Sequence, residues 1–363
     1  MRPVLSTAEG LPPGSTIGII GGGQLGRMLS IAAAPLGYKC HIFDPHEAPC
    51  AVDVAAHFTR AAFDDVEALR RFGETVDVVT YEFENVAVEP LAVLGEKLRP
   101  SARSLAVAQD RAEEKSFIVA CGAAVAPWRA VASLSDVDDA VSALGTPLVL
   151  KSRRYGYDGK GQMWVRAADE AADAWRAIRE QPAVAEAGIG FDAEFSIIIA
   201  RWSDGRHAFW DCPRNEHREG ILRRSSVPAG PEIAPHVEAA KASALAIAEA
   251  LDHVGVLTVE FFATPSGPLV NEIAPRVHNS GHWTIEGSET SQFEQHVRAI
   301  CGLPPGSTAL TGAAAMMDNL IGSDVERWPE LVAEPGAHVH LYGKGEARPG
   351  RKMGHVTRVI RRD

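Results

Sequence analysis

Two glutamates on either side of a predicted turn are the residues of this chain best placed to do chemistry. The runs VLTVEFFA (256–263) and LVNEIA (269–274) are typical of strands, and TPSGP between them is typical of a tight turn. A hairpin centred on Ser266 sets Glu260 opposite Glu272. Opposed like charges on neighbouring strands are destabilising, so we expect a cation between them. Mg²⁺ suits two carboxylates together with nucleotide phosphates. The alternative is a hairpin whose acids merely face solvent.

A polar cluster follows this hairpin directly. Arg276, His278 and Asn279 lie within four residues and are followed by Gly281, which indicates a loop that handles anions. His278 and His282 have the i, i+4 spacing of a zinc-binding helix, but the Ser-Gly pair between them disfavours that helix.

The composition bounds the class of protein. A length of 363 residues predicts two or three domains, and 46% hydrophobic residues allow sizeable cores. No apolar run approaches the roughly 20 residues needed to span a bilayer, and the first 15 residues lack a signal-peptide core. Five scattered cysteines without CxxC spacing favour a reducing cytoplasm and neither zinc nor a disulfide framework. The net charge of −11 argues against a general nucleic-acid binder.

The C-terminal stretch departs from this acidic balance. From Lys344 to Asp363 there are seven Lys or Arg residues against two acids. A solvated basic tail is one interpretation. The glycines and proline of GKGEARPGRKMGH favour the other, a shaped loop that clasps an anion.

The N-terminal region begins as a βαβ unit. TIGII (16–20) predicts a buried strand, and GGGQLGRMLSIAA opens a helix with GxGxxG spacing, followed by Asp44 at the end of the next strand. This layout suits a phosphate at a helix N-terminus and occurs in dinucleotide sites, but many non-redox folds share it. The predicted strand 76–86 releases Glu82 at its carboxyl end, where ligands bind in open α/β sheets. The first domain is expected to end near Asp110.

The middle region has a different rhythm. RRYGYDGKGQ (153–162) is a Gly-rich loop suited to wrapping phosphate oxygens, although it lacks the Walker order, and a surface loop without a ligand is the alternative. Residues 183–202 predict two strands whose linker can face a purine, and residues 207–222 predict one further strand carrying His217. The alanine-rich run 235–254 predicts a packing helix.

Together these motifs resemble the ATP-grasp enzymes, which close two α+β subdomains over ATP and form an acyl phosphate. Within that superfamily GGGQLGRM, GYDGKGQ, NEIAPRVHNSGHW and YGK…RPGRKMGHV are similar to the N5-carboxyaminoimidazole ribonucleotide synthase family of purine biosynthesis. The resemblance implies an α/β and α+β protein with three parts. These are a Rossmann-like N-terminal domain (1–110), an ATP-grasp domain (111–305, with a lid at about 125–190) and a small β-rich C-terminal domain (306–363).

The resemblance also implies the reaction. ATP would phosphorylate bicarbonate to carboxyphosphate, and aminoimidazole ribonucleotide would then be carboxylated on its 5-amino group through CO₂ released in the closed site. The cofactors would be ATP and Mg²⁺. A cytoplasmic homodimer without nucleic-acid or membrane partners is expected. The rivals are another ATP-grasp ligase, such as the formate-dependent glycinamide ribonucleotide transformylase with PRPHDTG in place of PRVHNSG, a non-catalytic nucleotide sensor, and an NAD oxidoreductase.

The same resemblance assigns residue roles. The residues implied to bind ATP are Arg111, Lys151, Gly156, Tyr157, Asp158, Gly159, Lys160, Gly161, Gln162, Glu186, Ala187, Gly188, Ile189, Glu194, His217, Asn271 and Glu272. Those implied to bind the ribonucleotide are Gln24, Leu25, Glu82, Tyr157, Asp158, Lys160, Lys344, Arg351 and Lys352. Glu260 and Glu272 would hold the metal, and Arg276, His278 and Asn279 would bind carboxyphosphate as catalytic residues.

One position departs from the superfamily pattern. Many ATP-grasp members carry an asparagine two residues after the second metal-binding glutamate, whereas this chain has Ala274. Phosphates, water or Asn271 must then complete the coordination, and Asn271 would face the opposite side of a regular strand.

Overall fold

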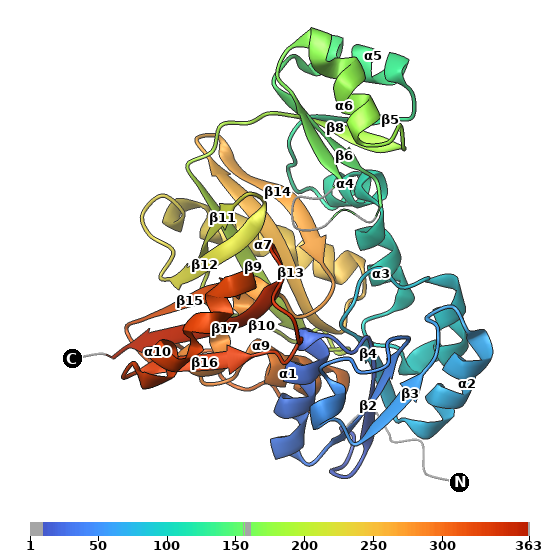
Figure 1. The fold of residues 1–363 in the computed structure, drawn as a ribbon, viewed down its shortest axis with the longest axis vertical. Helices are drawn as coiled ribbons and strands as arrows, with labels where there is room; N and C mark the ends of the chain where they lie inside the picture. The colour runs from blue at the N-terminus through green and yellow to red at the C-terminus, as the bar shows by residue number, and fades with distance from the viewer. Residues whose placement is uncertain (1–9, 155, 157–160, 362–363) are drawn as a thin grey trace.

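The structure, a computed structural model, describes residues 10–154, 156 and 161–361 (Figure 1). The expected ligands Tyr157, Asp158, Gly159 and Lys160 therefore lie outside the described residues.

The N-terminal region is a parallel sheet with helices packed against it. Its strands are β1 (Thr16–Ile20), β2 (Lys39–Asp44), β3 (His57–Arg60) and β4 (Val78–Tyr81), in the order β3-β2-β1-β4. The helical segments are α1 (Gln24–Ala33), η1 (Ala34–Leu36), η2 (Val52–Val54), α2 (Val66–Thr75), η3 (Glu89–Lys97) and α3 (Ala102–Gln109). The buried strands carry apolar side chains on both faces, as a covered parallel sheet requires. The predicted βαβ start is confirmed, and Glu82 follows β4 directly.

A smaller unit, the predicted lid, stands at the top of Figure 1. It contains β5 (Trp128–Val131), α5 (Leu134–Leu144), β6 (Leu148–Ser152), β7 (Gln162–Val165), η4 (Ala168–Glu170), α6 (Ala171–Ala177) and β8 (Ala183–Ala187). Its antiparallel sheet has the order β5-β8-β6-β7, and α5 and α6 bury Val137 and Trp175 against it. Helix α4 (Arg111–Ala120) precedes the lid and is N-capped by Asp110, which also pairs with Arg153 at 2.9 Å.

The body of the protein is one large antiparallel sheet of order β14-β13-β9-β11-β12-β15-β17-β16, with β10 pairing on β9. Its strands are β9 (Ala193–Arg201), β10 (His207–Phe209), β11 (Arg214–Arg218), β12 (Ile221–Val227), β13 (Gly255–Thr264), β14 (Gly267–Ala274), β15 (Ala314–Ile321), β16 (Ala337–Leu341) and β17 (Lys352–Ile360). The accompanying helical segments are η5 (Ala234–His236), α7 (Val237–Ala250), η6 (Asn279–Gly281), α8 (Thr284–Gly287), α9 (Gln292–Ile300), η7 (Gly322–Arg327) and α10 (Trp328–Ala333).

Helices cover both faces of this sheet. On β13, Leu257 and Val259 pack in the cluster that contains α7, whereas Val256 packs in the cluster that contains α9. This explains why VLTVEFFA is apolar nearly throughout rather than alternating, because both of its faces are buried.

The structure confirms one expectation about the middle region and corrects another. The two strands predicted within 183–202 form, but β8 belongs to the lid sheet and β9 to the large sheet, so their linker joins two units. Residues 207–222 contribute to three strands rather than one, because β10 and β11 pair with successive parts of β9 and the turn after β11 reverses the chain into β12. The C-terminal strands continue the large sheet through the pairing of β12 with β15.

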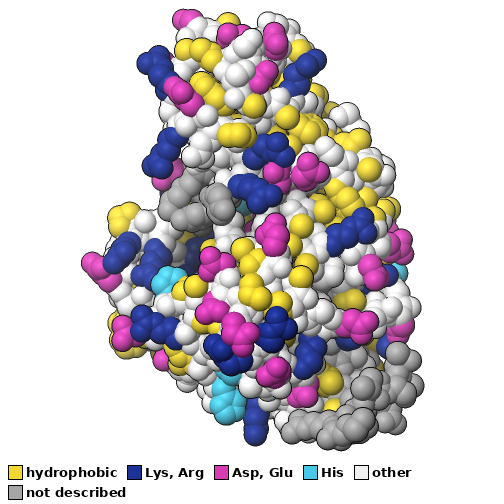
Figure 2. Space-filling model, turned by 90° about the vertical axis from the view of Figure 1, so that its right-hand side faces the viewer, with side chains coloured by type: hydrophobic (Ala, Val, Ile, Leu, Met, Phe, Trp, Pro, Cys, Tyr) yellow, Lys and Arg dark blue, Asp and Glu magenta, His cyan; other side chains and the backbone are white. Residues whose placement is uncertain are grey.

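The surface charge and the length of the helices bear on the kind of protein. On the face shown in Figure 2, Lys and Arg side chains are interspersed with Asp and Glu side chains. Within the described residues, no helix is long and apolar enough to cross a membrane.

Candidate active site

The predicted opposition of Glu260 and Glu272 is confirmed, and a β-bulge produces it. The hairpin turns between Thr264 and Gly267, and its register shifts by one residue between Glu260 and Phe261. Asn271 is the extra residue of this bulge. The pairing of Thr264 with Gly267 centres the turn between residues 265 and 266, half a residue before the expected centre at Ser266. Without the bulge, Glu260 would therefore pair with Asn271 and not with Glu272.

The bulge also corrects the expected direction of Asn271. A regular strand would point Asn271 away from Glu272, but both side chains line the same pocket. The Oδ1 of Asn271 accepts a hydrogen bond from Lys151 Nζ at 3.3 Å. Asn271 therefore presents its oxygen toward the site even though Ala274 offers no ligand.

The two carboxylates have different partners. Arg111 donates to Glu272 at 2.9 Å, and His278 Nε2 lies 3.3 Å from Glu260 Oε1. Burial alone would raise the pKa of Glu272, but Arg111 outweighs it and lowers that pKa. Burial, followed by the charge of Glu272, raises the pKa of Glu260. This pattern is that of two like charges sharing one site.

A buried lysine, which sequence reasoning missed, shares the carboxylate of Glu186 with Lys151. Lys115 is fully buried and lies 3.2 Å from Glu186 Oε1, while Lys151 lies 3.1 Å from Glu186 Oε2. Burial is the main cause that lowers the pKa of Lys151. The available signal was the i, i+4 spacing of Lys115 from Arg111, which puts both on one face of α4.

A pocket of about 390 Å³ between the lid and the large sheet gathers most of the predicted ATP residues. The predicted site residues that line it are Arg111, Lys151, Gln162, Glu186, Ala187, Gly188, Ile189, Glu194, His217, Glu260, Asn271, Glu272, His278, Asn279 and Lys352. Gly156 and Gly161 are outside this lining. Gly161 lies just before β7, where its carbonyl accepts from the Ser152 amide at 2.8 Å.

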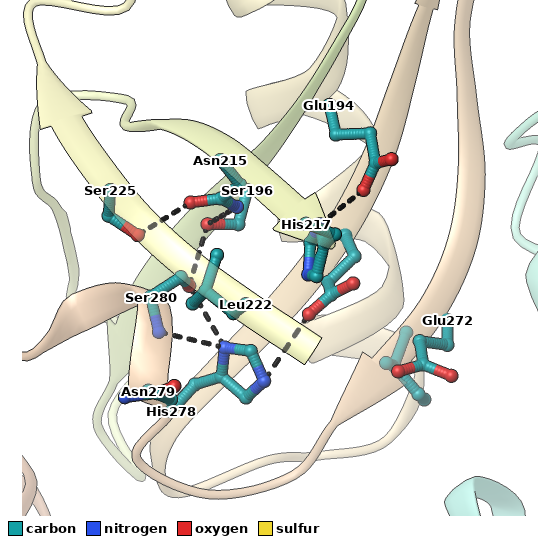
Figure 3. A network of polar contacts seen from close by, with 12 residues as sticks. Glu194, Ser196, Asn215, His217, Leu222, Ser225, Glu272, His278, Asn279 and Ser280 are labelled. Carbon is teal, nitrogen blue, oxygen red and sulfur yellow. Dashed lines mark hydrogen bonds and ion pairs between the residues drawn. The ribbon is translucent and has the colours of Figure 1, made fainter. Parts of the chain in front are cut away.

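The lid end of the pocket suits a purine nucleoside. Trp164, Phe191 and Phe262 line it, and the rings of Phe191 and Phe262 stack at 4.6 Å. These aromatic residues were not singled out from the sequence. Glu194 pairs with His217 across β9 and β11 (Figure 3). Burial alone would lower the pKa of His217, but its hydrogen bond to Glu194 raises it.

The loop after β14 is fixed by Gln292, another residue missed from sequence. Its Oε1 accepts from the His278 amide at 2.9 Å, and its Nε2 donates to the His278 carbonyl at 2.6 Å. A Cβ at Gly281 would lie 2.6 Å from Gln292 Oε1, so a side chain there would displace the Gln292 amide. Asn279 exchanges two amide hydrogen bonds with Asn319, at 2.9 and 2.8 Å.

Arg276 does not line the nucleotide pocket. It pairs with Glu84 in the loop after β4, with 2.6 Å between NH2 and Oε1, and it donates from NH1 to the Val277 carbonyl. The structure thus separates Arg276 from its neighbours His278 and Asn279 and turns it toward the N-terminal domain.

The glycine turn of the N-terminal domain is occupied by acids of the chain itself. Glu82 Oε1 accepts from the Gly23 amide at 2.7 Å, and Asp44 Oδ2 accepts from the Gly22 amide at 2.8 Å. Asp44 therefore serves the turn rather than a dinucleotide ribose. Gln24 and Leu25 begin α1 beside this turn.

The predicted basic residues of the C-terminal loop occupy different places. Burial lowers the pKa of Lys344 to about 8, and its ammonium lies 5.5 Å from the centre of the Tyr342 ring. The negative charge of Glu82 partly opposes this lowering of the pKa of Lys344. Arg351 donates to the Glu346 carbonyl at 3.1 Å, whereas Lys352 lines the nucleotide pocket.

Family comparisons agree with this organisation. Residues 15–109 match the ribonucleotide synthetase preATP-grasp domain, residues 116–293 the ATP-grasp domain, and residues 315–362 the phosphoribosylaminoimidazole carboxylase C-terminal domain. The fold and the site thus define an ATP-grasp protein, which confirms the predicted fold class.

Individual relatives narrow the family. The chain is 48% identical to the N5-carboxyaminoimidazole ribonucleotide synthase of Brucella melitensis, over 96% of this chain and 97% of the relative. It is similar to the solved N5-carboxyaminoimidazole ribonucleotide synthetase of Thermus thermophilus, with a TM-score of 0.88 and 45% identity over 96% of this chain and 94% of that chain. An Aspergillus clavatus enzyme, solved with ADP and 5-aminoimidazole ribonucleotide, gives a TM-score of 0.89 and 30% identity over 96% of this chain and 94% of that chain. This chain belongs to the N5-carboxyaminoimidazole ribonucleotide synthase family and is an ATP-dependent ligase.

Proposed function

We propose that this chain uses ATP and bicarbonate to carboxylate 5-aminoimidazole ribonucleotide on its 5-amino group, through carboxyphosphate. One observation carries the proposal. One pocket is lined by the two opposed carboxylates, by Lys151 and Arg111, and by His278 and Asn279 of the loop after β14. A nucleotide, a metal and a small oxyanion can therefore meet in that pocket.

In this proposal ATP lies across the pocket from the lid to the hairpin. The adenine would lie among the aromatic residues and the linker of Glu186 to Ile189, with Glu194 and His217 beside the ribose. Lys151 and Arg111 would face the phosphates, since both side chains are held by carboxylates and point into the pocket. Positioning and charge neutralisation are the main requirements of phosphoryl transfer.

The residues present fit Mg²⁺. Glu260, Glu272 and Asn271 offer the oxygen ligands that this cation prefers. Within the described residues, no group of three or more His, Cys, Asp or Glu side chains could hold a metal, so phosphate oxygens would have to complete the coordination. When bound, the cation would neutralise charge on the transferring phosphoryl group.

The loop after β14 and the N-terminal domain would hold the other two reactants. His278 and Asn279 would line the carboxyphosphate site, His278 through its contact with Glu260, with Arg276 reaching that site from the side of Glu84. The ribonucleotide would lie between the glycine turn and the basic C-terminal loop, where Lys344 and Arg351 offer charge to its phosphate. Carboxyphosphate is unstable in water, so closure of the lid over the pocket is part of the proposal.

The test is ADP release under defined substrates. We expect release with ATP, bicarbonate and aminoimidazole ribonucleotide together, and carboxylated product in equal amount. Formate with glycinamide ribonucleotide should give no release above background. Release with formate and glycinamide ribonucleotide would favour the transformylase alternative, and ATP binding without any turnover would favour a nucleotide sensor.

We also propose a homodimer and a cytoplasmic location. The five cysteines are free thiols, which suits a reducing compartment. Sedimentation equilibrium over a range of concentrations tests the dimer, and fractionation of cells producing the tagged protein tests the location.

A further inference from the structure

A chain of buried polar side chains crosses the large sheet and ends on His278 (Figure 3). Ser225 on β12, Asn215 on β11, Ser196 on β9 and Ser280 in η6 follow one another at hydrogen-bond distance. The three serines are fully buried and Asn215 is 4% exposed. Such a chain crosses an otherwise apolar core at a cost, since each polar group must be desolvated and paired. This points to a role beyond packing.

Two hydrogen bonds of this chain have a fixed donor, and the other two can be completed in the same direction. Ser225 Oγ donates to Asn215 Oδ1 at 2.8 Å, and Asn215 Nδ2 donates to Ser196 Oγ at 3.1 Å. Ser196 already accepts from Asn215, so its own hydrogen is available for Ser280 Oγ at 2.8 Å. Ser280 in turn directs its hydrogen to His278 Nδ1 at 2.9 Å.

The backbone gives the same answer independently. The Ser280 amide, which can only donate, points at His278 Nδ1 at 3.3 Å. A ring nitrogen that faces an N–H must present its lone pair. His278 Nδ1 is therefore the acceptor, and in the neutral ring the hydrogen is carried by Nε2. That Nε2 lies 3.3 Å from Glu260 Oε1.

We propose that Ser280, Ser196, Asn215 and Ser225 are positioning residues that hold His278 as a neutral Nε2–H donor aimed at Glu260. His278 would then orient the carboxylate of Glu260 and would not accept the amine proton of the reaction, because Nδ1 is occupied and Nε2 carries its hydrogen. Hydrogen bonds to a ligating carboxylate fix its orientation and are costly to remove. This inference rests on the proposed function for its kinetic part only.

The tautomer is tested on the free protein without substrates. In protein labelled with ¹⁵N-histidine, long-range ¹H–¹⁵N correlation spectra distinguish Nδ1–H from Nε2–H rings, and the signals lost in His278→Gln identify His278. We expect the Nε2–H form in the native protein. In Asn215→Asp the donor to Ser196 becomes an acceptor, and we expect an increased Nδ1–H population. An Nδ1–H ring in the native protein would overturn the proposal.

The kinetic test compares two buried serines that each bind a histidine. Ser280→Ala should lower kcat for ADP release about 10-fold, with the apparent KM for aminoimidazole ribonucleotide nearly unchanged. Ser104→Ala is the matched control. Ser104 is fully buried, its Oγ lies 3.1 Å from His253 Nδ1, and neither residue belongs to the site. It should lower the melting temperature while keeping kcat.

Each outcome is decisive. Equal kcat in Ser280→Ala and the native protein would overturn the positioning role, as would an equal loss of kcat in Ser104→Ala. Ser225→Ala, at the far end of the chain, provides a milder variant in case Asn215→Asp fails to fold, and its His278 spectrum should shift in the same direction. If the native protein releases no ADP, the proposed function fails, while the spectra still decide the tautomer.

Discussion

Arg276 and Glu84 form an ion pair, with 2.6 Å between NH2 and Oε1, that joins the loop after β14 to the loop after β4. Both side chains are mostly buried, with 19% and 27% exposed. Burial raises the pKa of Glu84, and the charge of Arg276 opposes that shift. The pair thus connects the N-terminal domain to the hairpin that carries Glu260 and Glu272, and it gives Arg276 a structural partner besides its proposed anion.

The two roles of Arg276 can be separated by Arg276→Lys and Glu84→Gln. A guanidinium can hold Glu84 through one nitrogen and face an oxyanion with another, whereas a lysine ammonium cannot match that planar fork. We expect Arg276→Lys to lower kcat by about 10²–10³, with the apparent KM for ATP nearly unchanged. Glu84→Gln should lower the melting temperature and keep most of kcat. A fully active lysine variant would leave Arg276 with the structural role alone.

The opposed carboxylates predict an asymmetry between two similar mutations. Glu260→Gln and Glu272→Gln should each lower kcat by at least about 10², because each removes charge proposed to hold Mg²⁺. Without Mg²⁺, however, Glu260→Gln relieves like-charge repulsion, whereas Glu272→Gln removes the carboxylate that pairs with the partly buried Arg111. We therefore expect the metal-free Glu272→Gln protein to melt at the lower temperature of the two.

Thermal melts with and without Mg²⁺ and a nucleotide check this prediction. Both variants should lose the Mg²⁺-dependent part of the melting shift. Glu238→Gln is the control, since the Glu238 side chain is 86% exposed on α7, where it pairs with Lys241. A normal Mg²⁺ response in either hairpin variant would contradict the metal assignment.

Lys344 predicts a pH dependence of substrate capture. Burial lowers its pKa to about 8, with Arg351 and Lys352 nearby adding to the effect. As pH rises through about 8 in the free enzyme, Lys344 loses the charge proposed to face the ribonucleotide phosphate. The value of kcat/KM for aminoimidazole ribonucleotide, which reports the free enzyme, should therefore decline above about pH 8.

Lys344→Arg is the matched test, because arginine stays charged at all working pH values. The decline of kcat/KM above pH 8 should disappear in that variant, while kcat/KM for ATP keeps its native profile. An unchanged decline would show that another group titrates. Arg351→Gln should raise the apparent KM for the ribonucleotide and spare that for ATP, whereas Lys352→Gln should affect both, since Lys352 lines the nucleotide pocket.

Local features of this chain were predictable from sequence because their causes are local. The strand at Thr16–Ile20 and the glycine turn after it follow from apolar patterning and glycine spacing. The pairing of Glu260 with Glu272 was also predicted, but through an assumed turn centre that the structure replaces with a bulge at Asn271. A bulge depends on how a strand pairs with its neighbouring strands, and no residue type in LVNEIA predicts one.

The contacts that position the site were not predictable, because they join residues far apart in the chain. Glu84 and Arg276 are 192 residues apart in the sequence (276 − 84 = 192) and yet form an ion pair. Gln292, in helix α9, accepts a hydrogen bond from the His278 amide. The spacing of Lys115 from Arg111 predicts that the two share a helix face, but it does not predict that Lys115 is buried against Glu186. Each of these side chains is ordinary in its local sequence and acquires its role only from tertiary packing.

Two buried histidines predict how stability responds to acid. His296 Nδ1 accepts from the Val256 amide at 3.0 Å, and its Nε2 bonds Thr80 Oγ1 at 2.8 Å. His253 bonds the Val256 carbonyl at 3.0 Å and is fully buried. Burial is the main cause that lowers the pKa of His296 to about 3 and that of His253 to about 4, from an ordinary value of 6.5. Both rings are therefore neutral in the folded protein, and a proton on His296 Nδ1 would face the Val256 N–H.

Because the unfolded chain binds protons at these histidines below about pH 6.5 and the folded chain does not, the free energy of unfolding falls as the pH falls from 6.5 toward 4. At pH 5 the loss is about 2 kcal/mol for each histidine, from 1.36 kcal/mol per pH unit. Urea unfolding at pH 7 and pH 5 measures it. In His296→Gln the difference between the two pH values should shrink by about 2 kcal/mol, whereas in His207→Gln, at an exposed position of β10, it should match the native protein. If the difference in unfolding free energy between pH 7 and pH 5 is undiminished in His296→Gln, the native His296 ring is already protonated in the folded protein at pH 5. The neutral ring would then not be what joins Thr80 of β4 to Val256 of β13.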